Sequence, residues 1–360
     1  MSPELSAIIV NYRQAALARR CAATLREAFS FEGIEGEIVL VDCASGEAES
    51  AALEAVPADV RLRLADNRGY AGGINAGLSR ASGRRILLSN ADVEYRPGAL
   101  TALLASLEDP RVGAAAPVCA WDAEGRVLLP PGFSPGFVEE LALLSPPRAG
   151  RGDVRRFAAF AREAVALWTR GGSARHLSGA VLAARRDAFD RAGRFDERFS
   201  FEYEETEWEG RVRALRMELR VVAEARVRHL WGASASGDPE TARRRVESRR
   251  LFRQRRYGRF GRALLERAER RGSAPRPAGH RRQPGSKPPR RGWEEVPARP
   301  GAWIGLSPNA SGIPFAGADL SRPFRLPEEL EATLPAGDWL CTVFSAHDGH
   351  PIESFLAGPR

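Results

Sequence analysis

The stretch ILLSNADVEY, residues 86–95, places an apolar run directly before Ser89, Asn90 and Asp92. A short apolar run bounded by polar residues is typical of a strand buried inside a parallel sheet. A carboxylate at the end of such a strand lies where open α/β sheets bind ligands. The stretch therefore predicts both a buried strand and a functional sheet edge at Asp92.

Four short apolar runs in the first ninety residues alternate with segments of helical spacing. The runs are residues 6–10, 37–42, 60–65 and 85–88. Alternation of this kind predicts a mainly parallel α/β sheet. Each run is followed by a polar side chain: Asn11, Asp42, Asp66 and Asp92. We expect these four side chains to meet at one edge of the sheet.

The later sequence predicts further elements of the same domain and then a change of composition. Residues 176–189 indicate a strand that enters a helix, residues 195–216 a loop that enters an amphipathic helix, and residues 218–234 a pair of strands. The domains expected are an α/β domain at 1–268 with basic C-terminal helices, a Pro/Gly/Arg linker at 269–292, and a small β-rich module of unassigned role at 293–360.

Length and cysteine usage narrow the class of protein. The 360 residues contain no uninterrupted apolar run of about 20 residues and no N-terminal signal pattern, which predicts a cytoplasmic protein. The four cysteines, Cys21, Cys43, Cys119 and Cys341, are widely scattered. This spacing indicates neither a disulfide framework nor a zinc site.

The net charge of +8 comes almost entirely from arginine, because Lys287 is the only lysine. Positive charge is concentrated in an arginine block at residues 243–291. One interpretation is a solvated helix face, and another is peripheral contact with an anionic membrane at the inner face of the cell. Nucleic acid is not the partner we expect.

Asp92 and His229 could form a metal site. A carboxylate at a strand end suits Mg²⁺ or Mn²⁺, and imidazole suits Mn²⁺ better than Mg²⁺, so the two side chains would make a pair if the fold brings them together. The alternatives are an Asp that belongs to a turn and a structural His. The acidic pair Glu204 and Glu205 also has two interpretations: favourable charge in a first helical turn, or a partly buried general base.

The segment DNRGYAGGINAG, residues 66–77, is glycine-rich at the start of a helical pattern. Its backbone could approach a phosphate or sugar closely, or it could simply form a tight turn. Asp42 has the same ambiguity, because an Asp after a strand can cap a helix or contact a nucleotide.

Taken together, the motifs carry a resemblance to a known family. They are, in chain order, AIIVNY (7–12), VDCAS (41–45), NRGYAGGINAGL (67–78), LSNADV (88–93), HLSGAVLAARRDAF (176–189), GRFDERFSFEYEETEWEGRVR (193–213) and VRHLWGAS (227–234). In this order the chain, over about residues 5–260, closely resembles the family 2 glycosyltransferases of GT-A fold, particularly their rhamnosyltransferase-like bacterial branch.

The resemblance implies roles for the strand ends. Asn11 and Asp42 would contact the nucleotide of a nucleoside-diphosphate sugar donor, with dTDP- or UDP-sugars favoured. The pocket for that donor would be lined by Asn67, Gly69, Gly73 and Asn75. Asp92 would be the last residue of the family's D-x-D metal motif, in which Asn90 replaces the first Asp.

The resemblance also implies an acceptor loop and a base. The loop would comprise His176, Ser178, Gly179 and Ala180, with His in place of the family's aromatic residue. Glu204 and Glu205 would stand at the Glu-Asp base motif, with Glu205 one methylene longer than the family's Asp.

The activity implied is inverting, metal-dependent transfer of a sugar to a hydroxyl of a glycan or lipid-linked acceptor, as in cell-surface polysaccharide biosynthesis. Departures at Asn90, His176 and Glu205 also allow a GT-A-like binding or scaffold protein that has lost turnover. A nucleotidyltransferase ranks last, because residues 2–20 lack the basic Gly-rich signature of such enzymes.

Overall fold

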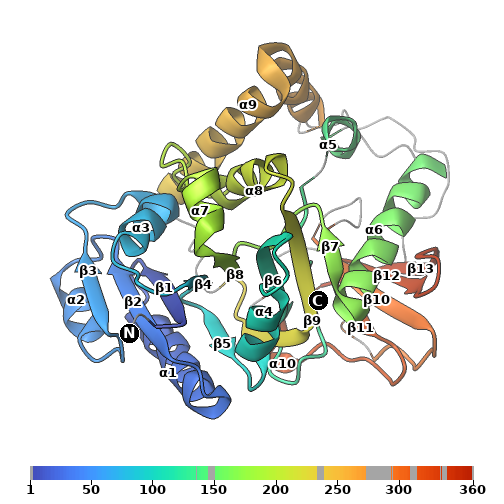
Figure 1. The fold of residues 1–360 in the computed structure, drawn as a ribbon. Coiled ribbons are helices and arrows are strands. Elements are labelled where there is room, and N and C mark those ends of the chain that lie inside the picture. Colours follow the sequence, from blue (N-terminus) through green and yellow to red (C-terminus); the bar gives the residue numbers. More distant parts are fainter. Residues whose placement is uncertain are drawn as a thin grey trace. The chain divides into compact units, whose positions relative to one another are not determined.

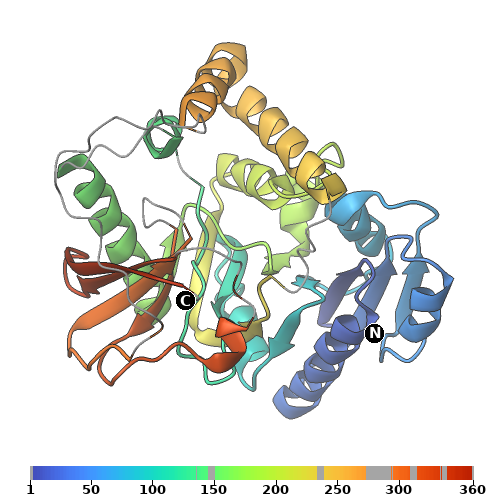
Figure 2. The same ribbon diagram turned by 180° about the vertical axis from the view of Figure 1, so that it is seen from behind.

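The computed structural model describes residues 3–134, 136–144, 151–232, 239–272, 293, 295–308, 314–332, 334 and 339–358, without the side chains of 151–153, 239 and 272. The chain divides into two compact units. The first comprises Met1–Gly125 and Leu167–Phe252, and the second comprises Arg126–Ala166 and Arg253–Arg360. Figure 1 and Figure 2 show the ribbon from opposite sides.

The first unit is built on a nine-stranded sheet in the order β3-β2-β1-β4-β8-β6-β9-β5, with β7 paired to β9. The strands are β1 (Leu5–Asn11), β2 (Gly36–Asp42), β3 (Val60–Arg63), β4 (Arg85–Asn90), β5 (Val93–Tyr95), β6 (Val112–Ala120), β7 (Gly172–Ala174), β8 (Val181–Arg185) and β9 (Glu218–His229). Strands β3, β2, β1 and β4 are parallel, as are β6 and β9, whereas β8, β5 and β7 run antiparallel to their neighbours. The predicted α/β class with a mainly parallel central sheet is confirmed.

The register places two of the four predicted polar strand ends, Asn11 and Asp42, at one edge together with Asn90, whereas Asp66 and Asp92 follow the ends of β3 and β4. Asn11 pairs with Asp42 in adjacent strands, and Val10 pairs with Asn90 on the other side of β1. Parallel neighbours end at the same edge, so these side chains are neighbours although about 80 residues separate the outermost two in sequence.

Residues 218–234 differ from the prediction of a strand pair. Residues 218–229 form the single strand β9, whose pairing with β6 shifts register between Pro117 and Val118. The shift accommodates extra residues of β9 as a bulge, so one bent strand replaces the two that the sequence suggested.

Helices cover both faces of this sheet. They are α1 (Ala15–Glu32), α2 (Glu47–Leu53), α3 (Gly69–Leu78), α4 (Ala99–Ser106), α7 (Arg186–Ala192) and α8 (Glu204–Ala214). Helix α3 packs on the face of Ile8, because a Cβ at Gly77 would lie 2.4 Å from that side chain. Helix α1 packs on the opposite face, where Cys21 Sγ lies 3.5 Å from Ser89 Oγ. The sheet is therefore buried on both faces, as its apolar strands require.

The second unit contains a four-stranded antiparallel sheet in the order β11-β10-β12-β13. The elements of this unit are α5 (Phe137–Leu144), β10 (Ala302–Ser307), β11 (Ala316–Asp319), α10 (Glu328–Glu331), β12 (Trp339–Ser345) and β13 (Pro351–Ala357). Its core includes Phe157, which stacks on Phe315 at 5.3 Å between ring centroids and meets Phe344 edge-on. The β-rich character expected of residues 293–360 is thus present, and residues 126–166 belong to the same unit.

Two long helices have parts in both units, α6 (Arg151–Arg170) and α9 (Pro239–Gly272). Helix α9 is kinked at Gly258, whose φ of 69° is not helical. The predicted linker at 269–292 lies mostly outside the described residues, which stop at 272 and resume at 293. None of the described helices combines the length and apolar character needed to span a membrane.

Candidate active site

Asn11 and Asp42 form a buried polar cluster at the sheet edge. Asn11 Nδ2 donates to Asp42 Oδ1 at 3.3 Å, and the hydroxyl of Ser45 donates to the same oxygen. The Ser50 hydroxyl donates to Oδ2 at 2.8 Å. Because burial without partners would be costly, these bonds explain how the Asp42 carboxylate is retained there. These hydrogen bonds hold the Asp42 carboxylate in one orientation at the carboxyl end of β2.

The glycine-rich segment follows β3 and opens α3. The Asn67 side chain accepts a hydrogen bond from the Gly69 amide at 2.9 Å, which forms a local turn. Gly69 has a φ of +71°, and a Cβ there would lie 2.4 Å from the carbonyl oxygen of Ser200. A Cβ at Gly73 would lie 2.7 Å from Val10. Glycine is therefore required by close backbone approaches at both positions.

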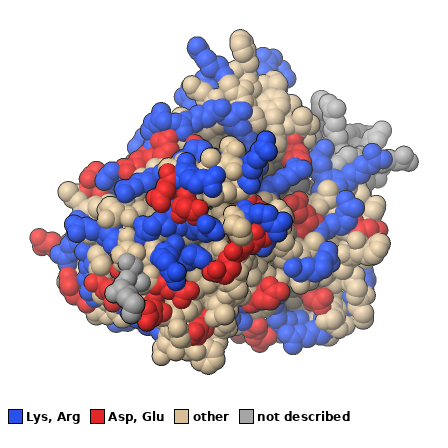
Figure 3. Space-filling model, in the orientation of Figure 1, with Lys and Arg blue, Asp and Glu red and all other residues tan. Residues whose placement is uncertain are grey.

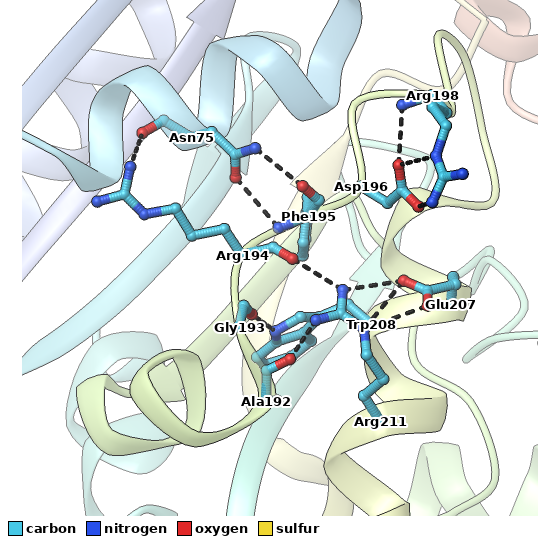
Figure 4. Close-up of polar contacts among 10 residues, drawn as sticks. All are labelled: Asn75, Ala192, Gly193, Arg194, Phe195, Asp196, Arg198, Glu207, Trp208 and Arg211. Carbon is cyan, nitrogen blue, oxygen red and sulfur yellow. Dashed lines mark hydrogen bonds and ion pairs between the residues drawn. The ribbon is translucent and has the colours of Figure 1, made fainter.

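Asn75 is committed to one loop, as Figure 4 shows. Its amide nitrogen donates to the Phe195 carbonyl and to Glu197, both at 2.9 Å, and its side-chain oxygen accepts from the Phe195 amide at 3.1 Å. Arg68 also pairs with Glu197. These contacts tie α3 to the loop of residues 193–200.

The same loop is held from α8 (Figure 4). Trp208 Nε1 donates to the Gly193 carbonyl at 2.9 Å. Arg211 donates to the Arg194 carbonyl at 2.8 Å while pairing with Glu207 one turn earlier on the helix. Residues 193–200 thus connect the glycine-rich helix to α8 through fixed contacts on both sides, and this fixes where α8 begins.

Asp92 and His229 are brought together by strand pairing. Val93 of β5 lies opposite His229 of β9, and the Leu230 amide donates to the Asp92 carbonyl at 2.9 Å. His229 Nε2 lies 3.3 Å from Asp92 Oδ1, and both side chains are buried. Among the described residues, none accepts from or donates to His229 Nδ1. The fold therefore brings Asp92 and His229 together, as a shared metal site would require.

The pair fits two adjacent ligands of one divalent ion. Ligand atoms at about 2.1 Å from a metal and about 90° apart are separated by about 3 Å, close to the 3.3 Å seen here. No cluster of three or more His, Cys, Asp or Glu suited to a metal exists in the part of the chain that the structure describes. Mg²⁺ is usually held through one or two carboxylates, with the remaining positions left to phosphate oxygens and water, and Asp92 supplies one such carboxylate. The His229 imidazole favours transition-metal ions over Mg²⁺. Asn90 ends β4, and its amide donates to the Ala180 carbonyl at 2.9 Å.

Glu204 and Glu205 begin α8, after a turn in which both Glu202 and Tyr203 have positive φ. Such conformations are rare outside glycine and often accompany functional sites. Burial, reinforced by the neighbouring charge of Glu205, raises the pKa of Glu204 well above its ordinary value. Burial also raises the pKa of Glu205, although His176 opposes that shift. In both carboxyls burial is the largest cause of the raised pKa, because burial disfavours the charged form.

The predicted acceptor loop lies against Glu205. A Cβ at Gly179 would be 2.9 Å from Cγ of Glu205, so glycine permits the contact. The Ala180 amide donates to the Ser178 hydroxyl at 3.5 Å within the loop. His176 pairs with Glu209 at the start of the loop. The structure therefore assembles the loop and the carboxylate that the sequence treated separately.

Two residues of this site were missed by the sequence analysis, Tyr70 and Glu209. The Tyr70 hydroxyl lies 3.4 Å from the Gly179 carbonyl, to which it donates. Burial and then the charges of Glu204, Glu205 and Asp92 raise the pKa of Tyr70. An aromatic residue inside the glycine-rich segment was the only signal for Tyr70.

Comparison with known proteins matches residues 6–166 to the model of glycosyl transferase family 2. The succinoglycan biosynthesis protein ExoO of Rhizobium meliloti (strain 1021) is 33% identical over 105 residues, which are 28% of this chain and 29% of that protein. The alignment thus spans less than a third of the relative. The family match accords with the α/β sheet and with the GT-A fold expected for this domain.

Solved structures show a more distant similarity. The mannosyltransferase PcManGT from Pyrobaculum calidifontis, in complex with GDP-Man and Mn²⁺, has a TM-score of 0.45 at 15% identity over 74% of each chain. TarS residues 1–349 from S. aureus have a TM-score of 0.47 at 13% identity, covering 76% of this chain and 90% of that one.

Proposed function

We propose that this chain, whose residues 6–166 match the model of glycosyl transferase family 2, transfers a sugar with inversion from a nucleoside-diphosphate donor to an acceptor hydroxyl. The observation that carries the proposal is the position of Glu205. It lies against Gly179 in a loop whose Gly179 carbonyl accepts from Tyr70 and whose Ala180 carbonyl accepts from the Asn90 amide at 2.9 Å, two residues before Asp92. These contacts support a base and a diphosphate site at one polar edge.

In this mechanism Glu205 accepts the proton of the acceptor hydroxyl as its oxygen bonds to the anomeric carbon of the donor sugar. The bond from that carbon to the diphosphate oxygen breaks with its electron pair, so the nucleoside diphosphate leaves from the opposite face. A carboxyl with a raised pKa is matched to this task near neutral pH. Glu204 is buried next to Glu205 in the first turn of α8, and the charge of Glu205 adds to burial in raising its pKa.

Asp92 and His229 would hold Mn²⁺ or Mg²⁺ in the proposed enzyme. When bound, such an ion supplies positive charge that stabilises the leaving diphosphate. Asn90, where the family has an acidic residue, stands at the same strand end and is neutral. We therefore expect metal affinity that depends on the phosphates of the donor as much as on protein ligands.

The donor would lie along the edge formed by Asn11, Asp42 and the segment from Asn67 to Asn75. A dTDP- or UDP-sugar, with rhamnose as one such sugar, is the donor that the sequence resemblance favours. The acceptor would be a glycan or a lipid-linked glycan of cell-surface polysaccharide biosynthesis. The name of the ExoO relative, a succinoglycan biosynthesis protein, supports this class of acceptor.

Contact with an anionic membrane is the second part of the proposal, and helix α9 supplies its surface. Many arginines at 243–272 are paired with acids, such as Arg253, which is buried between Glu140 and Glu269. After Gly258 the helix exposes Phe260 and Leu264, with 94% and 46% of their surface accessible. The same part of α9 carries four further exposed arginines: Arg259, Arg267, Arg270 and Arg271.

An apolar pair set among cations on one helix face suits the interface of an anionic leaflet. Figure 3 shows basic side chains over α9 at the top of the view, beside uncharged surface. The remainder of the arginine block, at 273–291, lies outside the described residues. The enzyme would then meet lipid-linked acceptors at the inner face of the membrane.

A donor panel tests the proposed transfer. Purified protein is melted with UDP-, dTDP- and GDP-sugars, each with and without Mn²⁺, and release of nucleoside diphosphate is measured in parallel. One nucleotide class should raise the melting temperature in the presence of Mn²⁺, because a ligand that binds only the folded state stabilises it. Asp92→Ala should lose the Mn²⁺-dependent part, whereas Asp190→Asn, which removes an exposed carboxylate of the same unit, should not. Donor binding with no transfer or hydrolysis would instead favour a scaffold that has lost turnover.

A further inference from the structure

A buried carboxylate on α8 has no part in the proposed chemistry. Glu209 lies one helical turn after Glu205 and is almost fully buried. Its Oε2 bonds to Nδ1 of His176, and its Oε1 accepts the amide of Leu177 at 3.1 Å. One side chain therefore binds both a side chain and the backbone of the loop between β7 and β8.

Helix α8 grips this loop at two points. Glu209 fixes its start, and Glu205 packs against Gly179 further along. Between them, the Thr206 hydroxyl lies 3.4 Å from Nε2 of His176. A substitution at Glu209 should therefore shift the loop 176–180, which Glu205 contacts at Gly179.

The charges of the pair also act on Glu205. Burial alone would lower the pKa of His176, but the charge and hydrogen bond of Glu209, together with Glu205, outweigh burial and raise it. On Glu205, burial raises the pKa, His176 lowers it and Glu209 raises it. The two members of the pair thus push the proton affinity of Glu205 in opposite directions.

Stability alone does not account for such a pair. Burying two charges costs several kcal/mol for each ion, and replacing a buried ion pair by apolar residues is often neutral or stabilising. Several charged or titratable groups shift the pKa of His176 or Glu205, or have their own pKa shifted by Glu205. They are Glu202, Glu204, Glu209 and Arg213 from α8 and its preceding turn, and Tyr70 from α3.

We propose that His176 and Glu209 are positioning residues: their buried ion pair fixes loop 176–180 against Glu205 and balances the charge that Glu205 experiences. The inference rests on the proposed role of Glu205 as the base. It goes further by naming the two groups that set the pH range in which this base works.

Three variants test the balance through the pH profile of kcat. A base works when ionised, so the rate falls on the acid side as Glu205 takes up a proton. His176→Gln leaves the charge of Glu209 unopposed, so the acid limb should move to higher pH by about half a unit or more. Glu209→Gln removes the repulsion between the charges of Glu209 and Glu205, so the acid limb of this variant should not move to higher pH. The double variant should return toward the wild-type profile, and Asp190→Asn should match the wild type.

A purely structural pair would give a different pattern. In that case each variant would lower kcat without moving the acid limb, or the double variant would remain as shifted as His176→Gln alone. Either result overturns the proposed charge balance. Thermal melts and nucleotide binding of each variant show whether the fold and donor site persist.

A readout without catalysis separates this inference from the proposed function. The chain has five histidines, so the imidazole signal of His176 can be assigned by its loss in His176→Gln and titrated by NMR. In Glu209→Gln, His176 should lose its proton at a pH about one unit lower than in the wild type. An unchanged titration overturns the pairing even if the enzyme is active. If the wild type transfers no sugar but the titration shifts as expected, the ion pair stands and the function fails.

Discussion

Glu205 is the residue on which the proposed chemistry depends most directly. Glu205→Gln keeps the shape of the side chain but removes its ability to accept a proton. We expect kcat to fall by about 10² to 10⁴, the range in which a positioned general base contributes. Binding of the nucleoside diphosphate should be nearly unchanged, because Glu205 contacts the acceptor loop at Gly179. Steady-state kinetics together with calorimetric titration of the nucleotide measure both.

The matched control for this variant is Asp190→Asn, which removes an exposed carboxylate from the same unit. It should leave kcat as it is. Loss of nucleotide binding in Glu205→Gln would assign the carboxylate to the donor pocket, and full turnover would remove it from the mechanism.

Glu204 makes a prediction about stability and pH. Its folded-state pKa is raised by burial and then by Glu205. A carboxyl with a raised folded pKa contributes stability below its unfolded pKa, near 4.3, and that contribution is lost as pH rises through the folded value. The loss is about 1.4 kcal/mol for every pH unit that separates the folded pKa from the unfolded one. Glu204→Gln should therefore unfold with a free energy that falls less steeply than that of the wild type between about pH 5 and pH 8.

Urea unfolding at several pH values measures that slope. Glu224→Gln, which neutralises an exposed glutamate of β9, serves as the control and should keep the wild-type slope. Equal slopes in Glu204→Gln and the wild type would show that Glu204 does not carry the raised pKa.

At the scale of single residues, the sequence could predict the site residues that lie at the ends of strands. Asp92 and His229 were paired from chemistry, and the register of β5 with β9 then brought them to 3.3 Å. Tyr70 and Glu209 could not be found in this way. Their partners, Gly179 and His176, are distant in sequence, and only the packing of α3 and α8 on the loop brings them together.

At the scale of elements, the fold of residues 176–180 depends on a glycine. A Cβ at Gly179 would come within 2.9 Å of Cγ and 3.1 Å of Cδ of Glu205, so Gly179→Ala must displace the loop or the carboxylate. We expect a fall in kcat of about tenfold to a hundredfold, because small displacements of a reacting group are costly. The melting temperature should also fall, because the nearest atom is Cγ near the base of the Glu205 side chain, and rotation of its carboxyl alone does not relieve the contact.

Gly210→Ala is the matched control on α8. No atom lies within 4 Å of a Cβ at that position, so the helix should gain about 1 kcal/mol from the higher helix propensity of alanine. Activity should be unaffected. Equal activity in Gly179→Ala and Gly210→Ala would show that contact between the loop and Glu205 is not needed for transfer.

Elements were predicted well where the apolar pattern was strong, and poorly where their limits depend on pairing between strands. The runs that became β1, β2 and β4 are buried on both faces, so their apolar sequence is sufficient to identify them. Strand β9 was divided in two, because its bulge interrupts the alternation that a sequence pattern can detect. The joining of residues 126–166 to the C-terminal unit gave no local signal, since it depends on contacts such as Phe157 with Phe315.

At the scale of the whole molecule, positive net charge would draw the protein to an anionic membrane surface, and inserted apolar side chains would keep it bound there. The chain carries a charge of +8, so it should approach anionic vesicles, and this attraction weakens with salt. Attraction alone does not distinguish a solvated basic helix from a membrane-binding one. Insertion of Phe260 and Leu264 does, because apolar contact with the acyl boundary persists at higher ionic strength.

The last prediction concerns this insertion. The double variant Phe260→Ala and Leu264→Ala keeps every charge but removes two large apolar side chains exposed on α9 after Gly258. Burying one such side chain is worth about 1.5 to 3 kcal/mol, so partition into vesicles of phosphatidylglycerol should weaken by about tenfold or more. Phe31→Ala, which removes another highly exposed phenylalanine, at 75% exposure on α1, should sediment with vesicles as the wild type does. If both variants bind alike in moderate salt, the arginine face is a solvated surface, and the enzyme must meet its acceptor without anchoring through α9.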